Sequence, residues 1–372
     1  MDLRAAPMGE MAKTFELSLD LFFKEIEQRA HAYPAPPKEF DPLMATRAQL
    51  EQFGLPPRPD EDNEPELFRL WARLLGKPLE IVATEFPKVV NGQPSPVPAN
   101  RVGRIARPGF RRFQSSRNWS GGYLTPERSN KLVHVSGTWQ VPDVSLPPIL
   151  PQDATQGDEF QSSVWVGIDG RRRYPMSSMP QIGTSQCFQI VDGIEKKRAY
   201  AWWQWWSLDE NYPPDNRNNP PVPIPNIGVS VNDEIIAGLT LRSADEVQFF
   251  IKNQTTGLFT TFLVVAPGPI LPLGSTAEWI VERPTVIGGH RLYPLPSYTD
   301  VVFRDCLAQS AASIGAPATV QQLDRLQFIR MVEVFPTPHR TSSVSVPRKW
   351  GDRSIRVRYR DASTPGSGGL LS

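Results

Sequence analysis

The chain has 372 residues and a formal net charge of +1, and 40% of its residues are hydrophobic, enough for a sizeable core in two or three ordinary domains. Residues 1–100 hold 16 acidic and 11 basic residues, whereas the rest of the chain holds 23 acidic and 29 basic residues. Neither part gathers basic residues as a nucleic-acid-binding protein does, and no apolar run is long enough to span a membrane. We therefore expect neither nucleic acid nor a membrane as a partner.

Residues that bind metals or form disulfides are few. The two cysteines, Cys187 and Cys306, allow at most one disulfide, so the fold cannot depend on a disulfide framework, and whether they pair stays open. The sequence has no HExxH motif, and its four histidines are scattered: His31, His134, His290 and His339. We expect no metal and no cofactor. The amino-terminal stretch lacks the uninterrupted apolar core and cleavage site of a standard signal peptide.

The first hundred residues are predicted to be helical and then linker-like. Apolar residues recur at helical spacing in a first stretch: Phe15, Leu19, Phe22, Phe23 and Ile26. A second helix is predicted to begin near Asn63, which stands three residues before Glu66 as in a capping box, with Pro65 in its first turn. Gly76 should end it. The Pro-rich stretch 91–100 is typical of a linker.

These patterns divide the chain into residues 1–108, a helical amino-terminal segment with a Pro-rich linker, and residues 109–372, a β-rich domain. From about residue 113, short β-rich runs alternate with Gly, Pro and Asn turns, and no βαβ unit appears. VQFFIKN and LFTTFLV, joined by QTTG, predict a hairpin. The fold class is therefore mainly β, an antiparallel two-sheet β-sandwich of jelly-roll or lectin-like type, with a small helical segment before it.

Four segments in the β-rich part stand out: RNWSGGY (117–123), SSVWVGIDG (162–170), PQIGTSQC (180–187) and STAEWIVERP (275–284). Together with AYAWWQWWS and NQTTG, and in this order, they resemble the glutamic peptidases, also called eqolisins. The resemblance covers about residues 113–360 and leaves out the first hundred. It implies an extracellular endopeptidase that acts on polypeptides with a Gln–Glu dyad on a sandwich of two antiparallel sheets. It also implies that residues 1–108 are a pro-segment removed in acid, and a permanent helical domain is the alternative.

The resemblance places the dyad at Gln181, in PQIG, and at Glu278, in TAEW. Glu278 also raises a question by itself, since the two-residue period of a strand puts it on the same face as Ile280. That face could open into a cleft, or an Arg could pair with the carboxylate. Amide hydrolysis without a metal needs a base to activate water and a donor for the oxyanion. A carboxylate serves as the base, and a carboxamide, neutral at any working pH, offers N–H donors and an acceptor.

Further residues are assigned by the same resemblance. Trp119 and Trp165 become walls of the substrate cleft rather than ordinary core aromatics, and Asp169 becomes a supporting hydrogen-bond partner rather than a turn residue. The run 202–206 holds too many Trp residues for one buried face. We expect Trp203 and Trp205 on opposite faces, with Trp206 lining the cleft.

The chain departs from the family pattern at some positions. Ser185 stands near a usual Asp, and Gln204 replaces a usual Glu. Arg171, Arg172 and Arg173 precede the predicted dyad Gln, and cations lower the pKa of a nearby carboxyl whereas like charges raise it. An acid pH optimum therefore stays open. The alternative function, from another class, is a non-catalytic Trp-rich sandwich that binds peptide or carbohydrate by stacking.

Overall fold

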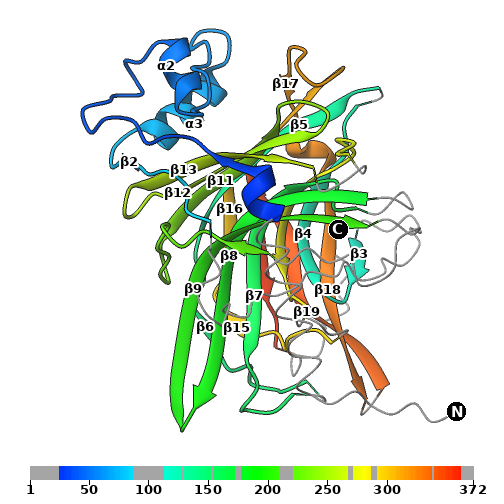
Figure 1. The fold of residues 1–372 in the computed structure, drawn as a ribbon. Helices are drawn as coiled ribbons and strands as arrows, with labels where there is room; N and C mark the ends of the chain where they lie inside the picture. Colours follow the sequence, from blue (N-terminus) through cyan, green and yellow to red (C-terminus); the bar gives the residue numbers. More distant parts are fainter. Residues whose placement is uncertain are drawn as a thin grey trace, which may run out of the picture.

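The structure is a computed structural model that describes residues 25–86, 113–127, 129–151, 154–171, 177–208, 221–266, 271–285, 291–336 and 339–361. Its strands form two stacked antiparallel sheets, which confirms the predicted β-sandwich (Figure 1). The predicted linker 91–100 and the apolar residues Phe15, Leu19, Phe22 and Phe23 lie outside the described residues. Ile26, the last residue of that pattern, lies in a short helical stretch and is buried in the main core.

The first sheet, called sheet 1, is antiparallel apart from one short edge pairing. In spatial order its main strands are β13 (Leu258–Val265), β12 (Glu246–Asn253), β11 (Glu234–Leu241), β5 (Lys131–Gln140) and β16 (Val301–Ala311). The free edge of β13 pairs with β1 (Ala30–Ala32) and, in parallel, with β2 (Glu80–Ile81), and β17 (Thr319–Val320) pairs with β16. The β12–β13 pair is the hairpin predicted around QTTG.

The second sheet, called sheet 2, holds most of the sequence motifs. Its order is β10 (Val222–Pro223), β9 (Ile194–Leu208), β8 (Ser177–Val191), β7 (Phe160–Ile168), β14 (Ala277–Glu282), β4 (Trp119–Leu124), β18 (Gln327–Pro336), β19 (His339–Gly351) and β20 (Ser354–Tyr359). β3 (Phe113–Ser116) runs parallel to β18. β16 links the sheets, because its first residues pair with β20 and its later ones with β5.

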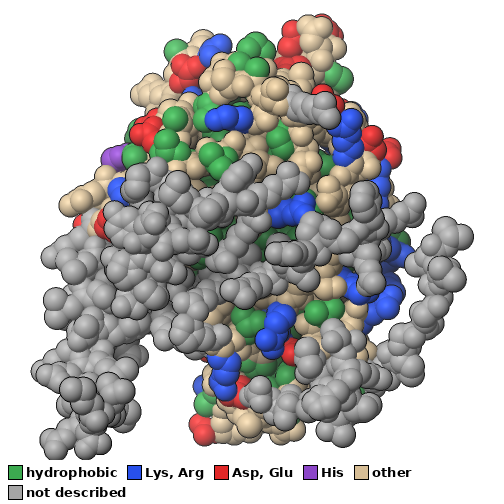
Figure 2. Space-filling model, turned by 90° about the vertical axis from the view of Figure 1, so that its right-hand side faces the viewer, with side chains coloured by type: hydrophobic (Ala, Val, Ile, Leu, Met, Phe, Trp, Pro, Cys, Tyr) green, Lys and Arg blue, Asp and Glu red, His purple; other side chains and the backbone are tan. Residues whose placement is uncertain are grey.

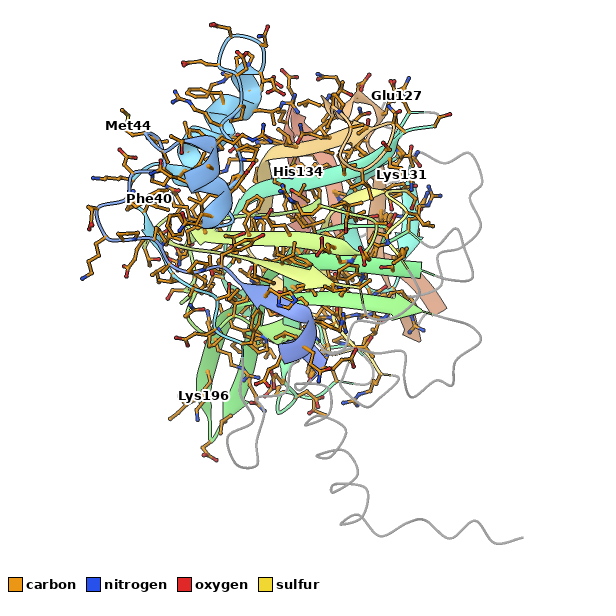
Figure 3. The ribbon with its side chains drawn as sticks, turned by 45° about the horizontal axis from the view of Figure 1, so that its top comes forward. Phe40, Met44, Glu127, Lys131, His134 and Lys196 are labelled. Atoms are coloured by element: carbon orange, nitrogen blue, oxygen red, sulfur yellow. The ribbon has the colours of Figure 1, made fainter. Side chains whose placement is uncertain are left out.

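Small elements complete the sandwich. β6 (Val144–Ser145) pairs with β15 (Ser297–Tyr298), and a 3₁₀ turn spans Leu323–Arg325. The long β8–β9 hairpin projects beyond the sheets, and Figure 3 labels Lys196 near its tip. Cys187 and Cys306 are buried free thiols, so they do not pair.

The main core fills the space between the sheets with the inward residues of both. Sheet 2 contributes Trp279 of β14, Val166 of β7 and both Trp203 and Trp205 of β9. The expectation that Trp203 and Trp205 point to opposite faces is therefore wrong: residues two apart on a strand share a face. The division falls instead between this pair and Trp202 with Trp206, which lie on the other side of the sheet.

A helical layer covers the outer face of sheet 1 (Figure 1). It consists of α2 (Arg47–Gln52) and α3 (Pro65–Leu75), whose apolar residues pack on the sheet in one cluster. That cluster comprises Leu50, Phe53, Leu55, Trp71, Leu74 and Leu75 of the layer and Ile236, Phe250 and Phe259 of the sheet. In Figure 3, Phe40 and Met44 mark this layer and His134 marks the neighbouring strand β5.

The predicted helix 63–76 exists, but its predicted start is wrong. Glu64, without a side-chain cap, is the first flanking residue of α3, and Pro65 begins the helix. The side chain of Asn63 instead donates to Asp60, which offers a local turn in place of a cap. A capping box occurs at the unpredicted helix α2, where Thr46 and Gln49 bond reciprocally.

Candidate active site

One row of residues crosses the outer face of sheet 2 and brings the two predicted dyad residues together. Each residue in the row is the register partner of the next on the neighbouring strand: Gln204, Gln181, Gly167, Glu278, Tyr123 and Gln327. We call this set the polar row. Gln181 and Glu278 thus flank Gly167 from β8 and β14. Because adjacent strands lie about 4.8 Å apart, their backbones are about 10 Å apart.

The sequence fixes which side of the sheet each of these residues faces. On β14, Ala277, Trp279 and Val281 join the core between the sheets, so Glu278 faces outward with Ile280. Glycine at position 167 leaves the space over the middle strand open to its neighbours. A Cβ there would lie 3.2 Å from the Cβ of Gln181 and 3.0 Å from the ring of Trp165. The glycine therefore leaves the space over the middle strand to the side chains of Trp165 and Gln181.

Glu278 is fully buried, and neither carboxyl oxygen has a hydrogen-bond partner of normal geometry among the described residues. Burial raises the pKa of Glu278 to about 8, since the charged form is poorly solvated. The Thr276 hydroxyl and the amides of Gly170 and Arg171 lie close enough to oppose part of this rise, while the charge of Asp169 adds to it. Of the two explanations considered for Glu278, a cleft and an Arg partner, the second does not hold among the described residues, because no Arg there pairs with the carboxylate.

Gln181 is also fully buried, and its carboxamide is oriented by the neighbouring strand. Its Nε2 donates to Oε1 of Gln204 at 2.6 Å, while its own Oε1 has no partner among the described residues. Gln204 therefore orients the carboxamide of Gln181. Of the two N–H groups on Nε2, one is engaged and one is available for a ligand.

Asp169 follows β7 with a positive φ of 66°, a conformation that Asp tolerates better than most residues. Its carboxylate accepts the backbone N–H groups of Leu273, Gly274 and Ser275, and also the Ser275 hydroxyl. Burial raises the pKa of Asp169, and these four donors oppose the rise. The side chain thus holds the chain that enters β14, two residues before Ala277, and so supports Glu278 from a distance.

The predicted aromatic residues surround the polar row. Trp119, Trp165 and Trp206 belong to a second cluster on the outer face of sheet 2, with Tyr123, Met179, Trp202, Ile280 and Ile329. All three are at most 2% exposed. The Trp119 and Trp165 rings meet edge to face with centroids 5.0 Å apart. The structure thus brings Trp119, Trp165 and Trp206 to the face that carries the dyad residues, and it buries them there.

Sequence reasoning missed several residues of this face. Tyr123 flanks Glu278 on β4; its hydroxyl donates to Gln327 and accepts from Gln114, each at 2.6 Å. Arg171 lies over the Tyr123 ring at 4.7 Å. Glu282 is a second buried carboxylate on β14, and its spacing of four residues from Glu278 was the available signal. Register partners such as Gly167 have no signal in a single sequence.

The described part of the chain contains neither a metal-binding cluster nor a membrane-spanning helix. No group of three His, Cys, Asp or Glu side chains there is arranged to hold a metal ion. None of the helices described there is both long and apolar enough to cross a membrane. Figure 2 shows one face of the molecule, on which Lys and Arg side chains are scattered among hydrophobic and neutral ones.

The motifs on this face agree with a known family. The model of the Peptidase A4 family matches residues 117–338, which include Trp119, Gln181 and Glu278. The chain belongs to this family. The resemblance to glutamic peptidases inferred from the motifs is therefore confirmed, and so is the prediction of a peptide hydrolase.

The chain also has individual relatives, to which its sequence is only distantly similar. The chain is 27% identical over 222 residues to Aspergillopepsin-2 of Aspergillus niger, across 56% of this chain and 70% of that protein. Among solved structures, scytalido-glutamic peptidase with a transition state analog inhibitor matches with a TM-score of 0.46 and 21% identity, over 66% of this chain and 98% of that one. Aspergilloglutamic peptidase from Aspergillus niger matches with a TM-score of 0.37 and 22% identity, over 54% and 99%.

Proposed function

We propose that the protein is an endopeptidase in which Glu278 and Gln181 act as the catalytic dyad. The observation that carries the proposal is that both carboxyl oxygens of Glu278 and the Oε1 atom of Gln181 are buried without partners among the described residues, on the two strands that flank Gly167. Leaving buried polar atoms unpaired costs stability, about 1–3 kcal/mol for each group. Such groups are retained where a ligand or a reaction uses them.

The chemistry follows from the two functional groups. A water molecule bound between them donates one hydrogen bond to the Glu278 carboxylate and one to Oε1 of Gln181. Glu278 takes a proton as the water oxygen bonds to the scissile carbonyl carbon, and the N–H of Gln181 that Gln204 leaves available donates to the resulting oxyanion. Glu278 then returns the proton to the amide nitrogen, the C–N bond breaks, and the dyad regains its starting state.

Protonation of Glu278 controls the first step. The base form of Glu278 is its carboxylate. Burial disfavours this charged form and raises the pKa of Glu278 to about 8. The rate constant kcat/KM should therefore decline on the acid side of the Glu278 pKa in the free enzyme. Gln181 and Gln204 stay neutral, so this pair adds no second titration of its own. Because the dyad residues are fully buried, peptide binding also requires this face to become accessible.

A non-catalytic binding protein is the second candidate, favoured by the clustered Trp residues beside the row. The two candidates differ in what happens to a bound peptide. We expect the purified protein to digest a denatured protein within pH 2–8, with no effect of pepstatin or chelators. Glu278→Gln should bind peptide without cutting it. Peptide binding by the wild type with no cleavage at any pH would favour the binding protein and overturn the peptidase.

A further inference from the structure

The second buried carboxylate of β14, Glu282, holds the aromatic wall of the site. Its Oε1 accepts from the Asn118 side chain at 3.1 Å, and its Oε2 accepts the indole N–H of Trp165 at 2.8 Å. Trp119 is the register partner of Glu282, and its indole lies beside the same carboxylate without a hydrogen bond of normal geometry. Three of the sequence motifs therefore meet at one side chain, because Asn118 and Trp119 come from RNW and Trp165 from VWVG.

Glu282 and Glu278 share a strand face and full burial, but they differ in their hydrogen-bond partners. Both lie on the outer face of β14 and both are fully buried. Glu282 has a donor on each oxygen, whereas Glu278 has none of normal geometry among the described residues. Four residues of strand separate their backbones by about 13 Å, too far for both to act on one peptide bond. Glu282 is thus a fixed acceptor, whereas Glu278 is available to react.

The indoles connect Glu282 to the dyad. Trp165 and Trp119 contact each other edge to face, and the far end of the Trp119 ring lies against Gly170. A Cβ on Gly170 would lie 2.7 Å from that ring and 3.3 Å from the carboxyl carbon of Glu278. The Trp165 ring lies 3.0 Å from the position that a Cβ on Gly167 would occupy. A shift of either indole would therefore change the space beside Glu278 and Gln181.

We propose that Glu282 is a positioning residue that fixes the indoles of Trp165 and Trp119 beside the dyad and thereby determines how tightly a peptide binds. The proposal rests on the proposed function, since it concerns the same site. Glu282 touches neither the reacting atoms nor the water between the dyad residues. Its loss should act through the indoles, on KM rather than on kcat.

The test is a double-mutant cycle with Glu282→Gln and Trp165→Phe, assayed with a peptide substrate. Glutamine keeps one acceptor oxygen but turns an NH₂ group toward a donor, so one hydrogen bond to a buried carboxyl oxygen is lost. We expect Glu282→Gln to lower kcat/KM about tenfold or more, through a higher KM, with kcat nearly unchanged. In the Trp165→Phe background the same change should have a much smaller effect, because the donor is already absent.

Thr184→Val is the matched control. The Thr184 hydroxyl accepts the indole N–H of Trp139 at 3.1 Å and the side-chain N–H of Gln186 at 2.8 Å, so this variant also removes an indole hydrogen bond, on the other face of the sheet. It should lower the melting temperature and leave KM unchanged. If Glu282→Gln does not fold, Trp165→Phe alone should raise KM, since it removes the donor and keeps the carboxylate.

Two kinetic outcomes would overturn the proposal: an unchanged KM in Glu282→Gln or Trp165→Phe, or an equal effect of Glu282→Gln in both backgrounds. The hydrogen-bond state of the indoles, followed by ultraviolet resonance Raman spectroscopy, gives a reading that does not depend on turnover. We expect one indole to lose its strong acceptor in Glu282→Gln, and an unchanged spectrum would also contradict the proposal. If the wild type is inactive but Glu282→Gln shows the expected spectral change, the proposed function is wrong. The anchoring of the indoles by Glu282 would still hold.

Discussion

The two outer faces of the sandwich are both buried, but they are built in opposite ways. On sheet 1 the outward residues Ile236, Phe250 and Phe259 are apolar and pack against the helical layer. On sheet 2 the outward residues combine an aromatic cluster with the polar row, in which Glu278 and Gln181 keep oxygens without described partners. Apolar burial stabilises the folded state, whereas unpaired buried polar atoms destabilise it. The outer face of sheet 1 therefore stabilises the protein, whereas the unpaired oxygens on sheet 2 reduce its stability.

The contacts of the helical layer bear on whether the amino-terminal segment is a pro-segment. If opposite charge held the acidic segment on the basic domain, the segment would supply the carboxylates of the ion pairs, yet Arg73 of α3 provides the cation that pairs with Glu234 and Asp305. Arg353 pairs with Glu66 in the expected sense. The larger contact is the apolar cluster, which acid does not titrate. We therefore propose that the described part of the segment, residues 25–86, is a permanent layer of sheet 1, and that the β-rich unit of residues 109–372 carries the activity.

The largest effect should come from breaking the polar row while leaving the helical layer intact. Gln181→Ala removes the oxyanion donor, and losses of this kind cost about 10²–10³ in kcat. The melting temperature should change little, because the variant also removes an unpaired buried oxygen. Steady-state kinetics and thermal unfolding on the same preparation check both expectations. Near-normal turnover by the folded variant would exclude Gln181 from catalysis.

The reverse change should break the helical layer and spare the row. Trp71 is 4% exposed in the cluster on sheet 1, and its indole N–H donates to Pro56 O at 2.8 Å. Trp71→Ala should lower the free energy of unfolding by about 3–5 kcal/mol, the usual cost of truncating a buried aromatic residue. At a temperature where the variant is still folded, kcat and KM should match the wild type. A large fall in kcat there would show that the two faces are coupled.

Much of this comparison could be predicted from the sequence, because it depends on patterns within single strands. In β14, apolar residues alternate with Glu278: Ala277, Trp279 and Val281. This alternation indicates that the carboxylate faces away from the core. Pairing between strands is a different matter. That Gly167 stands between Gln181 and Glu278 depends on the register of three strands far apart in the chain, which no local pattern records.

Other misses have equally physical causes. Asn63 was assigned as a helix cap because its spacing to Glu66 fits, but Asp60 competes successfully for its side chain. Helix α2 is only six residues long, too short to show a period. Glu282 was passed over because a strand carboxylate is usually exposed, and only the three-dimensional arrangement shows two donors converging on it.

A smaller effect should follow from filling the gap in the polar row. In Gly167→Ala the new methyl group would lie 3.0 Å from Pro180 O and 3.2 Å from the Cβ of Gln181, tighter than ordinary contact. Overpacking of this kind costs about 1–3 kcal/mol, and here it should displace Gln181 and lower kcat/KM by about tenfold to a hundredfold. Gly228→Ala, where a Cβ meets no atom within 4 Å and the backbone is not in the left-handed region, controls for changes at glycine. Full activity of Gly167→Ala would mean that the dyad does not need this gap.

The pH dependence of stability should also distinguish the faces. The folded-state pKa of Glu278, about 8, lies above its ordinary value of 4.5, so the folded protein binds more protons than the unfolded chain between these values. The free energy of unfolding should therefore fall as pH rises from about 4.5 to about 8. Glu278→Gln should reduce this fall and be more stable than the wild type at pH 8. Glu195→Gln, at an exposed position on β9, should leave the slope unchanged, as denaturant titrations at several pH values can show.

The smallest effect concerns the ion pairs of the helical layer. Arg73 is 35% exposed, and half-exposed pairs contribute at most about 1 kcal/mol, which salt screens further. Arg73→Met should therefore cost about 1 kcal/mol at low salt and less at high salt. Burial lowers the pKa of His134, beside the apolar cluster, to about 4. Between pH 7 and 5 the layer should thus stay docked, with Trp71 fluorescence and protease resistance unchanged. Release of the helices at pH 5, before the sandwich unfolds, would show that charge holds the layer and would revive the acid-released pro-segment.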